Sequence, residues 1–388
     1  MLKRRAAVAR RRTAAPKRGP AGKKLRVGVV KRRSAAVKFG TKARKRRKTG
    51  GSARSRRKPA IRFKVKPGSW LNWGIDAGKK DAGDHPIGGE ASHQIALNRI
   101  WQETSKAKHL SSWPNYWSAA KGYVQGYSQV SGIHAENWVL MPTGKTVSAV
   151  LTVMNEEDSV LSVVQELRRL PLKELIVVVN GSEDQTFQKV RSGSDALVVY
   201  YQHRLGHDVG RAIGSKLADS DIILFVDGDF TIPAEQLLPF IASVDRGTDM
   251  ALNNITPYLG SYASLDAVSI VKRFLNLVMG RPDLASNSLT AVPHAVSRKA
   301  LETIGIESLM VPPKAQIKAL LAGLSISAPW SVDVISMNKM KRFNSGERSP
   351  VADLIVGDHI EAFGAAFEKK GDRLSFPDKL RKRHYAAE

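Results

Sequence analysis

The chain has 388 residues, of which 42% are hydrophobic, so it can bury one large core or two smaller ones. It has no cysteine, which excludes disulfides, thiolate zinc sites and a cysteine nucleophile. Its formal net charge of +27 is concentrated at one end.

The N-terminal part carries the whole charge imbalance. Residues 1–66 hold 28 Lys and Arg and no Asp or Glu, which leaves 34 basic and 35 acidic residues in the rest of the chain. Runs such as residues 42–48 repel themselves and cannot form a core, so we predict a disordered tail over residues 1–67. Its charge suits an anionic membrane surface, nucleic acid or an acidic polymer. A tail that serves only solubility or retention is the alternative.

No segment is predicted to cross a membrane. No apolar run approaches the roughly 20 residues that span a bilayer, and no apolar stretch follows the basic start as in a secretory signal. We therefore expect a cytoplasmic protein, peripheral on a membrane or polyanionic surface if the tail binds one.

Residues 68–145 form an accessory segment rich in tryptophan and tyrosine. We expect the rings to pack together against the rest of the chain, because aromatics dominate cores more often than they line sites. Stacking on sugars or bases is the alternative. The pattern does not indicate a fold for this segment. Six of the seven tryptophans lie here: Trp70, Trp73, Trp101, Trp113, Trp117 and Trp138.

From residue 146 onward, strand and helix patterns alternate. Continuous apolar strands that alternate with helices predict an α/β fold, with a mostly parallel sheet covered on both faces. Ligands of such sheets bind beyond the carboxyl ends of the strands. Four apolar runs predict strands, over residues 147–153, 175–179, 196–201 and 221–226. Helical spacing predicts helices over residues 159–170 and 208–218, the second opened by Asp208 as an N-cap.

The fourth strand runs directly into Asp227-Gly228-Asp229. Residues two apart in an extended segment point the same way, so both carboxylates can face one point. Gly228 is expected to let a ligand approach the backbone. Two hard oxygen donors suit Mg²⁺ or Mn²⁺ shared with a substrate phosphate. The sequence therefore predicts a metal site here, although such triplets also occur by chance in loops.

Four motifs, in this order and spacing, resemble those of a family 2 nucleotide-sugar glycosyltransferase with the GT-A fold. They lie at residues 152–158, 177–186, 206–214 and 225–229. The resemblance implies a GT-A domain over residues 146–338, with residues 339–388 as a C-terminal loop and helix that complete the active site. It implies an enzyme that uses Mg²⁺ or Mn²⁺ to move a sugar from a UDP- or GDP-sugar to an acceptor.

The resemblance also implies roles for single residues. Asp229 is the firmer metal ligand, and Asp227 lies near the ribose and the diphosphate. Asn180 takes the position that reads the base, and an amide leaves the base open because it both donates and accepts. The residues expected at the donor nucleotide are Val153, Asn155, Glu156, Asn180, Gly206, His207, Arg211 and Asp227.

The acceptor side departs from the pattern of the family. Inverting members place an acidic pair where this chain has Val311-Pro312-Pro313-Lys314. Glu307 is the nearest candidate base, and Lys314 is a candidate for binding an anionic acceptor. An ionised acceptor needs no base, and the pattern resembles dolichyl-phosphate sugar synthases and glucosyl-phosphoglycerate synthases, which use phosphorylated acceptors. The stereochemical outcome stays open.

The C-terminal part supplies further candidates. Arg342 and Arg348 lie in a Gly/Ser/Pro-containing loop suited to closing over a diphosphate. His359 is the candidate third metal ligand, with Asp358 beside it; a helix that starts at Asp358, with His359 on its surface, is the alternative.

Two other functions remain open at this point. A nucleotidyltransferase on a related sheet is one, but it favours a basic phosphate loop where this chain has the acidic Asn155-Glu156-Glu157. A non-enzymatic protein that binds a polyanion or a surface through a degenerate transferase domain is the other.

Overall fold

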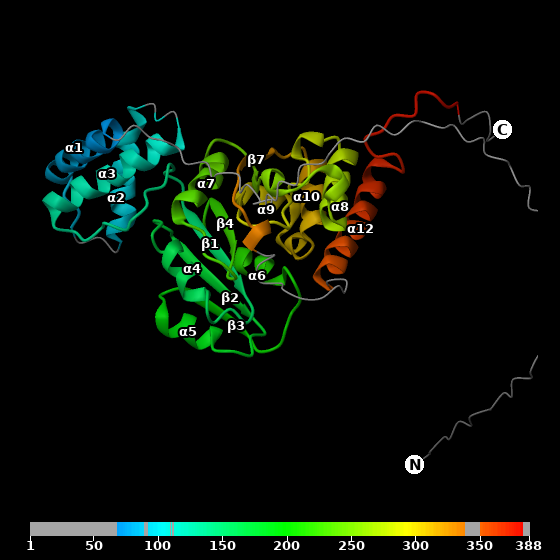
Figure 1. Ribbon diagram of the computed structural model, residues 1–388, viewed down its shortest axis with the longest axis horizontal. Helices are drawn as coiled ribbons and strands as arrows, with labels where there is room; N and C mark the ends of the chain where they lie inside the picture. The colour runs from blue at the N-terminus through cyan, green and yellow to red at the C-terminus, as the bar shows by residue number, and fades with distance from the viewer. Residues whose placement is uncertain (1–67, 89–91, 109, 111, 338–349, 383–388) are drawn as a thin grey trace, which may run out of the picture. The chain divides into compact units, whose positions relative to one another are not determined.

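The computed structural model describes residues 68–88, 92–108, 110, 112–337 and 350–382 (Figure 1). Within these residues, no helix combines the length and the apolar character that a membrane span requires. The predicted tail lies outside the described residues.

The accessory segment begins with three helices, α1 (Ser69–Asp84), α2 (His93–Lys106) and α3 (Trp113–Ser131). Serine side chains cap α2 and α3 at their N-termini by accepting a backbone N–H, and α3 ends at Gly132, which has a φ of 69°. The serine caps and the C-terminal glycine therefore account for where these helices begin and where α3 ends.

Helices α1 and α3 pack backbone against backbone through glycines. Gly74 and Gly78 on α1 face α3, and Gly122 and Gly126 on α3 face α1. A Cβ at Gly126 would lie 2.1 Å from the carbonyl oxygen of Ile75, much closer than any side chain can approach. Small residues spaced four apart on both helices allow this close approach.

Aromatic side chains fill the space around this helix pair. Trp101, Tyr123 and Tyr127 are fully buried. The Trp101 Nε1 donates a hydrogen bond to the Tyr116 hydroxyl at 2.9 Å, and the Tyr123 hydroxyl donates to Asp81 at 2.8 Å. The expectation that these rings pack in a core is confirmed.

Replacing Gly126 with alanine is expected to lower the free energy of unfolding by at least about 1–3 kcal/mol, because the added methyl group forces α1 and α3 apart. Gly83 lies in α1, and a Cβ added there would have no atom within 4 Å. Gly83→Ala is therefore the matched control and is expected to be neutral or stabilising. Urea unfolding followed by tryptophan fluorescence measures both. Equal stability of the two variants would contradict the backbone contact.

The sheet has seven strands in the order β3-β2-β1-β4-β6-β5-β7. Only β6 runs antiparallel to its neighbours, so the predicted mostly parallel sheet is confirmed. The four strands predicted from the sequence are β1 to β4, within one residue at each end. The strands are β1 (Val147–Val153), β2 (Glu174–Asn180), β3 (Leu197–Tyr201), β4 (Ile222–Asp227), β5 (Met250–Asn253), β6 (His294–Ser297) and β7 (Ile326–Trp330).

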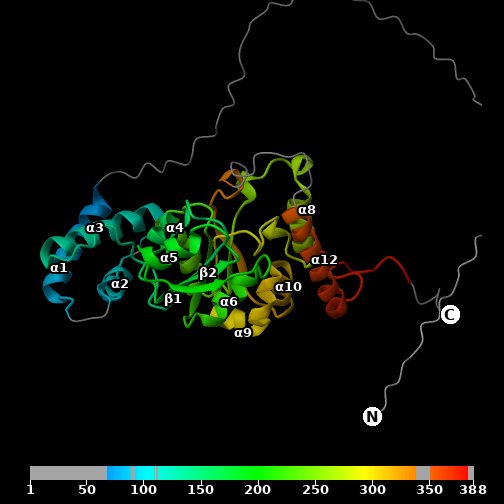
Figure 2. The same cartoon turned by 90° about the horizontal axis from the view of Figure 1, so that it is seen from below.

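Helices cover both faces of the sheet (Figures 1 and 2). Alternate residues of β1 enter different cores: Leu151 packs with α4 and α7, and Val150 packs with α6, α9 and α10. The helices that follow β1 are α4 (Val160–Leu167), α5 (Thr186–Gly193), α6 (Val209–Leu217), α7 (Leu238–Asp245), α8 (Ala267–Val278), α9 (Arg298–Ile304), α10 (Pro312–Leu321) and α12 (Pro350–Lys370). Short 3-10 turns, among them η2 (Thr256–Tyr258) and η5 (Ile306–Met310), connect some of them.

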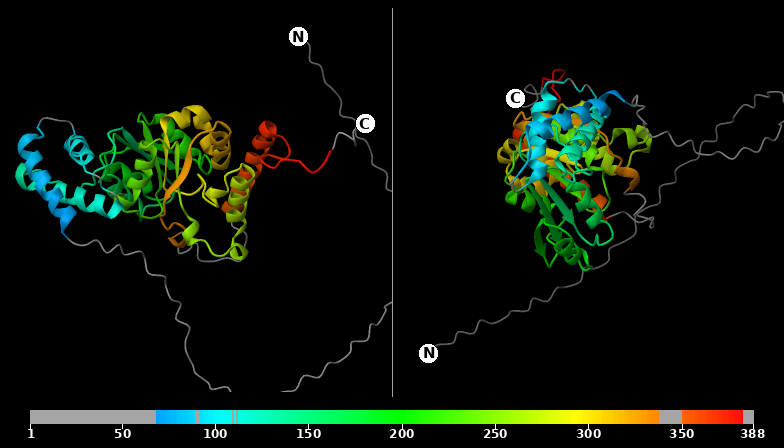
Figure 3. Two further views of the ribbon diagram at one scale, coloured as in Figure 1. Left: turned by 90° about the horizontal axis from the view of Figure 1, so that it is seen from above. Right: turned by 90° about the vertical axis from the view of Figure 1, so that its left-hand side faces the viewer.

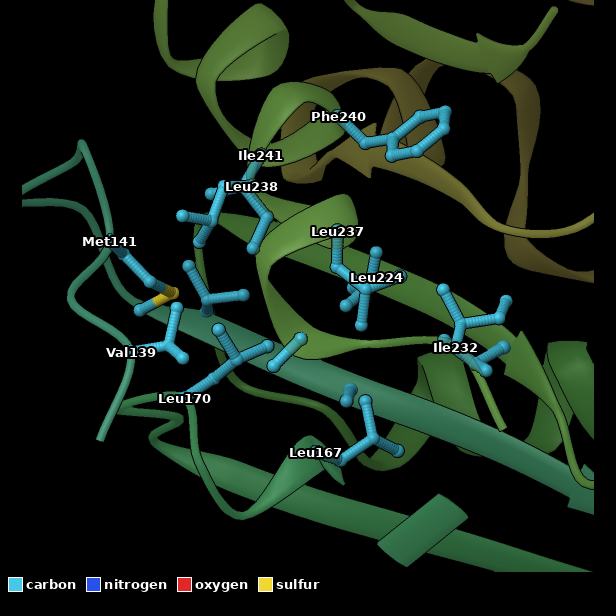
Figure 4. Close-up of a cluster of buried hydrophobic side chains, with 14 of the residues drawn as sticks. Val139, Met141, Leu167, Leu170, Leu224, Ile232, Leu237, Leu238, Phe240 and Ile241 are labelled. Carbon is cyan, nitrogen blue, oxygen red and sulfur yellow. The ribbon is translucent and has the colours of Figure 1, made fainter. Parts of the chain in front are cut away.

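The segment that links the helices to the sheet shares the core of the sheet. Figure 4 shows Val139 and Met141 packed in one cluster with Leu167, Leu224 and Leu238. Trp330 at the end of β7 also contacts the rings of Trp113 and Trp117 at centroid distances of 6.5 and 5.9 Å. The aromatic helices are thus continuous with the core under one face of the sheet.

Candidate active site

The loops that follow β1 and β2 are tied together at the carboxyl edge of the sheet. The Asn155 backbone N–H donates to Ser182 Oγ at 3.1 Å, and Asn155 Oδ1 accepts the backbone N–H of Glu183 at 2.8 Å. Asn155 has a φ of 58°, a left-handed conformation that asparagine tolerates. The Glu156 backbone N–H donates to Thr186 Oγ1 at 2.8 Å. The structure therefore brings the predicted donor residues of both strands to one place.

Asp184, in the turn after β2, joins the loops that follow β1 and β2. It accepts hydrogen bonds from the backbone N–H of Glu157 and Thr186. Partial burial opposes ionisation of Asp184, but these bonds and the one from the Thr186 hydroxyl outweigh it and lower the pKa of the carboxyl. The turn is thus fixed by a charged group.

The Asp-Gly-Asp segment at the end of β4 is fixed by β1 and by the start of α4. Thr152 is the register partner of Asp227, and its hydroxyl donates to Asp227 Oδ1 at 3.2 Å. The Ser159 hydroxyl donates to the carbonyl oxygen of Gly228 at 2.6 Å. A Cβ at Gly228 would lie 2.3 Å from Val153 Cγ1, so the glycine makes room for a neighbouring strand residue, and the approach of a ligand to its backbone stays a prediction.

Arg211 is buried between two carboxylates. Its side chain is 4% exposed, and its guanidinium lies 2.9 Å from Asp208 and 3.5 Å from Asp227. It also donates to the carbonyl oxygen of Leu289 at 3.1 Å. Asp208 precedes α6 as predicted, but its side chain makes no cap hydrogen bond and pairs with Arg211 instead. The sequence pattern showed Arg211 and missed its partner.

Asn180 at the end of β2 anchors the loop before α6. Its amide nitrogen donates to the carbonyl oxygen of Gly206 at 2.8 Å, and its amide oxygen accepts the N–H of Leu205 at 2.8 Å. Gly206 has a φ of 119°, which favours glycine. His207 beside it is half exposed, with Nε2 at 3.8 Å from Asp208. Reading of the base by Asn180 stays a prediction and would use the remaining hydrogen-bonding capacity of the amide.

A second buried cation lies near Arg211. Lys272 on α8 is 8% exposed. Burial lowers the pKa of its ammonium to about 8; Asp266 and Asp208 oppose this shift, and the charge of Arg211 adds to it. Three carboxylates, Asp208, Asp227 and Asp266, thus act on the two buried cations Arg211 and Lys272. Sequence spacing gave no sign of Lys272, because its burial depends on packing between helices.

His294 on β6 is buried against β4. Its ring stacks on Phe225 at a centroid distance of 4.9 Å, and Nδ1 lies 3.2 Å from the carbonyl oxygen of Ala291. Burial, and secondarily the charge of Arg211, lowers the pKa of His294 to about 3. The folded protein therefore holds this imidazole neutral.

This histidine is expected to make the protein less stable in acid. The folded pKa lies below the unfolded value of 6.5, so the unfolded chain takes up the proton first and stability falls as the pH falls from 6.5 towards 3. We expect His294→Phe to remove about 1.5 kcal/mol of the stability difference between pH 6.5 and pH 5. Urea titrations at both pH values measure it. His134 has a 95% exposed side chain, so His134→Gln is the control and should keep the wild-type pH dependence.

The two acceptor-side candidates, Glu307 and Lys314, lie on neighbouring elements. Glu307 is exposed on η5, and its carboxylate lies close to Gly305. Lys314 on α10 forms an ion pair with Glu361 on α12 at 2.7 Å, so its ammonium already has a carboxylate partner. Their proposed roles at the acceptor stay predictions.

The C-terminal helix differs from both sequence-based expectations. α12 begins at Pro350, so Asp358 lies inside the helix and is not its cap. Burial, with the charges of Asp208 and Glu361, raises the pKa of Asp358 to about 6. Arg342 and Arg348 lie outside the described residues.

His359 does not complete the predicted metal site. It is fully buried, and its Nδ1 lies 2.7 Å from the carbonyl oxygen of Ile355 one turn earlier in α12. Burial lowers the pKa of His359 to about 4. Among the residues that the structure describes, no three His, Asp or Glu side chains gather as metal ligands, so the set of Asp227, Asp229 and His359 is not formed.

The donors at the end of β4 nevertheless fit a hard cation. Asp227 and Asp229 are both partly exposed at the strand end. Mg²⁺ is usually held by one or two carboxylates, with substrate phosphates and water completing its coordination. Two carboxylates without a third protein ligand match that mode of binding.

A cavity of about 420 Å³ lies elsewhere, beside η2 and β7. Its polar lining includes Asn254, Thr256, Asn287 and Ser327. None of the residues predicted to bind the donor nucleotide lines it.

The mostly parallel sheet, whose fourth strand ends in Asp-Gly-Asp beside a buried arginine, is a GT-A-like arrangement. The family model described as glycosyl transferase family 2 matches residues 148–301 of this chain. The resemblance seen in the four motifs is thereby confirmed.

Curated relatives share part of this region. A glucosyl-3-phosphoglycerate synthase of Mycolicibacterium paratuberculosis is 35% identical over 109 residues, which cover 25% of this chain and 32% of the relative. The synthase of the same name from Mycolicibacterium smegmatis is 31% identical over 142 residues, covering 34% and 41%. An uncharacterised glycosyltransferase of Mycobacterium tuberculosis is 28% identical over 119 residues, covering 30% and 52%. The chain thus spans a third to a half of the length of these relatives.

Among solved structures, a similar chain is glucosyl-3-phosphoglycerate synthase from Mycobacterium tuberculosis in complex with Mn²⁺, UDP and phosphoglyceric acid. Its TM-score is 0.42 at 17% identity, and the match covers 61% of this chain and 81% of that one. The same enzyme with Mg²⁺ and UDP has a TM-score of 0.41.

Proposed function

We propose that this protein is a metal-dependent glycosyltransferase that moves a sugar from a nucleoside diphosphate sugar to a phosphorylated or otherwise anionic acceptor. The observation that carries the proposal is the Asp227-Gly228-Asp229 segment, held by Thr152 and Ser159 at the carboxyl edge of the sheet, with Arg211 buried beside it. Its place within a family 2 domain supports the same reaction.

The donor would lie across the loops after β1, β2 and β4. Asp229, with Asp227, would hold Mg²⁺ or Mn²⁺, which supplies positive charge where the departing diphosphate becomes more negative. Asn155, Glu156 and Asn180 line the loops that would receive the nucleoside. Their hydrogen bonds, from Asn155 to Ser182, from Glu156 to Thr186 and from Asn180 to Gly206, fix these loops before the donor binds, so little ordering is needed at that step.

The acceptor side of the chain favours an anionic acceptor. Where inverting members of the family place an acidic pair, this chain has Val311-Pro312-Pro313-Lys314, so no carboxylate stands at the position expected for a general base. An ionised phosphate or carboxylate attacks without losing a proton, so the exposed position of Glu307 is no obstacle. The names of the relatives that share 31–35% identity with part of this chain point to the same acceptor class, with phosphoglycerate as a first candidate.

A thermal-shift screen of UDP, GDP and ADP, each with and without Mn²⁺, tests the donor side. We expect a metal-dependent stabilisation by one nucleotide. The matching nucleotide sugars are then incubated with 3-phosphoglycerate, and sugar transfer is followed by mass spectrometry. Release of pyrophosphate from a nucleoside triphosphate would instead indicate a nucleotidyltransferase. If no nucleotide shifts the melting temperature, the domain is a scaffold for binding a surface or a polyanion.

A further inference from the structure

Helix α8 exposes an apolar stripe that no described residue covers. Ile270, Phe274 and Leu277 are exposed and spaced four and three residues apart, so they lie on one side of the helix. The part of α8 next to this stripe carries Leu275 and Val278, which are buried in the core. The exposed stripe therefore comes in addition to the packing that α8 needs for folding.

Helix α12 carries a matching stripe next to it. Ile360 is 65% exposed, and Phe363 and Phe367 follow it on the same side of the helix. The rings of Phe274 and Phe363 meet edge to face at a centroid distance of 5.4 Å, which joins the two stripes. Figures 1, 2 and 3 show α8 and α12 side by side. We call these six residues of the two stripes the α8–α12 face.

The chain after α12 extends this face. The Ser375 backbone N–H donates to the carbonyl oxygen of Val278 at 3.1 Å, which returns the chain to the end of α8. Phe376 follows at this position and is exposed, and Leu380 is 98% exposed. Phe376 therefore adds a large apolar side chain in solvent near the end of α8, and Leu380 is a further exposed apolar side chain four residues along the chain.

The apolar residues are accompanied by positive charge. Residues 369–382 contain six Lys and Arg and two Asp, and Arg273 is exposed next to Phe274 on α8. Of the two exposed acids beside the α12 stripe, Glu361 is paired with Lys314 and Glu368 adjoins the basic segment. One of the two aspartates, Asp378, is paired with Arg381 at 3.4 Å. An exposed apolar face with a basic border is the surface chemistry of segments that lie in the interface of an anionic membrane.

We propose that the α8–α12 face, with Phe376 and Leu380, docks this protein on an anionic lipid surface. The phenyl and aliphatic side chains enter the boundary between head groups and acyl chains, and the lysines and arginines of residues 369–382 face the lipid phosphates. The proposal does not depend on the catalytic activity. The basic sequence of residues 1–66 adds a second attraction to the same surface.

The positive charge of residues 369–382 favours an anionic lipid surface over a second copy of the chain or a nucleic acid as the partner of this apolar face. In a symmetric pair of chains, each copy would bring the basic segment of residues 369–382 against the other, and like charges oppose that contact. Nucleic acid would use the basic residues but would leave the aliphatic side chains Ile270, Leu277 and Ile360 in water. Only an anionic amphiphilic surface satisfies both kinds of side chain.

The chain has no cysteine, so a single introduced cysteine can be labelled without further changes. Leu380→Cys carries an environment-sensitive fluorophore, and Val130→Cys, a 53% exposed site at the end of α3, is the control. With vesicles of phosphatidylcholine and phosphatidylglycerol, we expect a blue shift and a gain in intensity for the label at residue 380 and no change at residue 130. Vesicles of phosphatidylcholine alone should give a much weaker signal.

A sedimentation assay separates the face from the basic N-terminal residues. At about 1 M salt the Debye length falls to about 3 Å, so purely electrostatic binding is lost. We expect Phe367→Ser combined with Phe376→Ser to lower residual vesicle binding of the full chain about tenfold, with Val130→Ser unchanged.

Three results would overturn the proposal. The first is an equal response of the labels at residues 380 and 130 to vesicles, and the second is that the double variant binds vesicles at high salt as strongly as the wild type does. The third is a signal from the label at residue 380 that rises with protein concentration when no vesicles are present. The last result would assign the face to self-association.

Discussion

Replacing Arg211 with methionine is expected to lower the free energy of unfolding by about 3–5 kcal/mol. Arg211 is 4% exposed, and its guanidinium lies between the carboxylates of Asp208 and Asp227. Methionine fills much of the volume but leaves the buried Asp208 carboxylate without its cation, and it leaves the Leu289 carbonyl oxygen without its donor. Urea unfolding at pH 7 measures the loss.

A double variant distinguishes charge from volume. Arg211→Met combined with Asp208→Asn removes both charges of the closest pair, so it should recover part of the stability that the single variant loses. Lys216→Met, an exposed position on the same helix, is the control and should stay within about 0.5 kcal/mol of wild type. If Arg211→Met is no less stable than Lys216→Met, the buried pair does not contribute as the geometry indicates.

The sheet could be predicted because its signals are local. Strands β1 to β4 are continuous apolar runs bounded by polar turns, and their carboxyl ends meet at one edge in any parallel sheet. The positions of Asn155, Asn180 and Asp227 in the candidate site follow from that rule alone. Arg211 was named through the resemblance of residues 206–214 to a family 2 motif.

The misplaced residues depend on contacts between elements far apart in the sequence. The sequence predicted Asp208 as the cap of α6, but its carboxylate pairs with Arg211, because a buried guanidinium requires a counter-charge. Lys314 pairs with Glu361 across α10 and α12, and His359 was enclosed when α12 packed on α8 and α10. No spacing within one segment encodes such contacts.

The fold of the accessory segment was also outside the reach of pattern analysis. Its glycines, at positions 74, 78, 122 and 126, read as breaks in a helix when each is considered alone. Their meaning appears only when α1 and α3 are placed together, since each glycine admits the backbone of the other helix. The signal was the repeated spacing of four on two separate segments.

Asp229→Asn is expected to lower kcat/KM for sugar transfer by roughly 10²–10³-fold, as the loss of one group that stabilises developing charge does in other enzymes. The amide keeps the size of the side chain and loses the negative charge that a hard cation requires. Thermal shift by nucleotide should lose its dependence on Mn²⁺, and the electron paramagnetic resonance signal of free Mn²⁺ should no longer fall when protein and nucleotide are added. Asp195→Asn, at an exposed carboxylate paired with Arg168, is the control for loss of one negative charge.

Asp227→Asn is expected to differ in its effects from Asp229→Asn, because the two carboxylates have different surroundings. Asp227 accepts from the Thr152 hydroxyl and lies beside Arg211, so its neutralisation also removes one of the two counter-charges of the buried guanidinium. We therefore expect Asp227→Asn to lower stability as well as activity, whereas Asp229→Asn should lower activity with little change in the urea midpoint. Full Mn²⁺-dependent nucleotide binding by Asp229→Asn would place the cation elsewhere and remove the basis for assigning diphosphate chemistry to the end of β4.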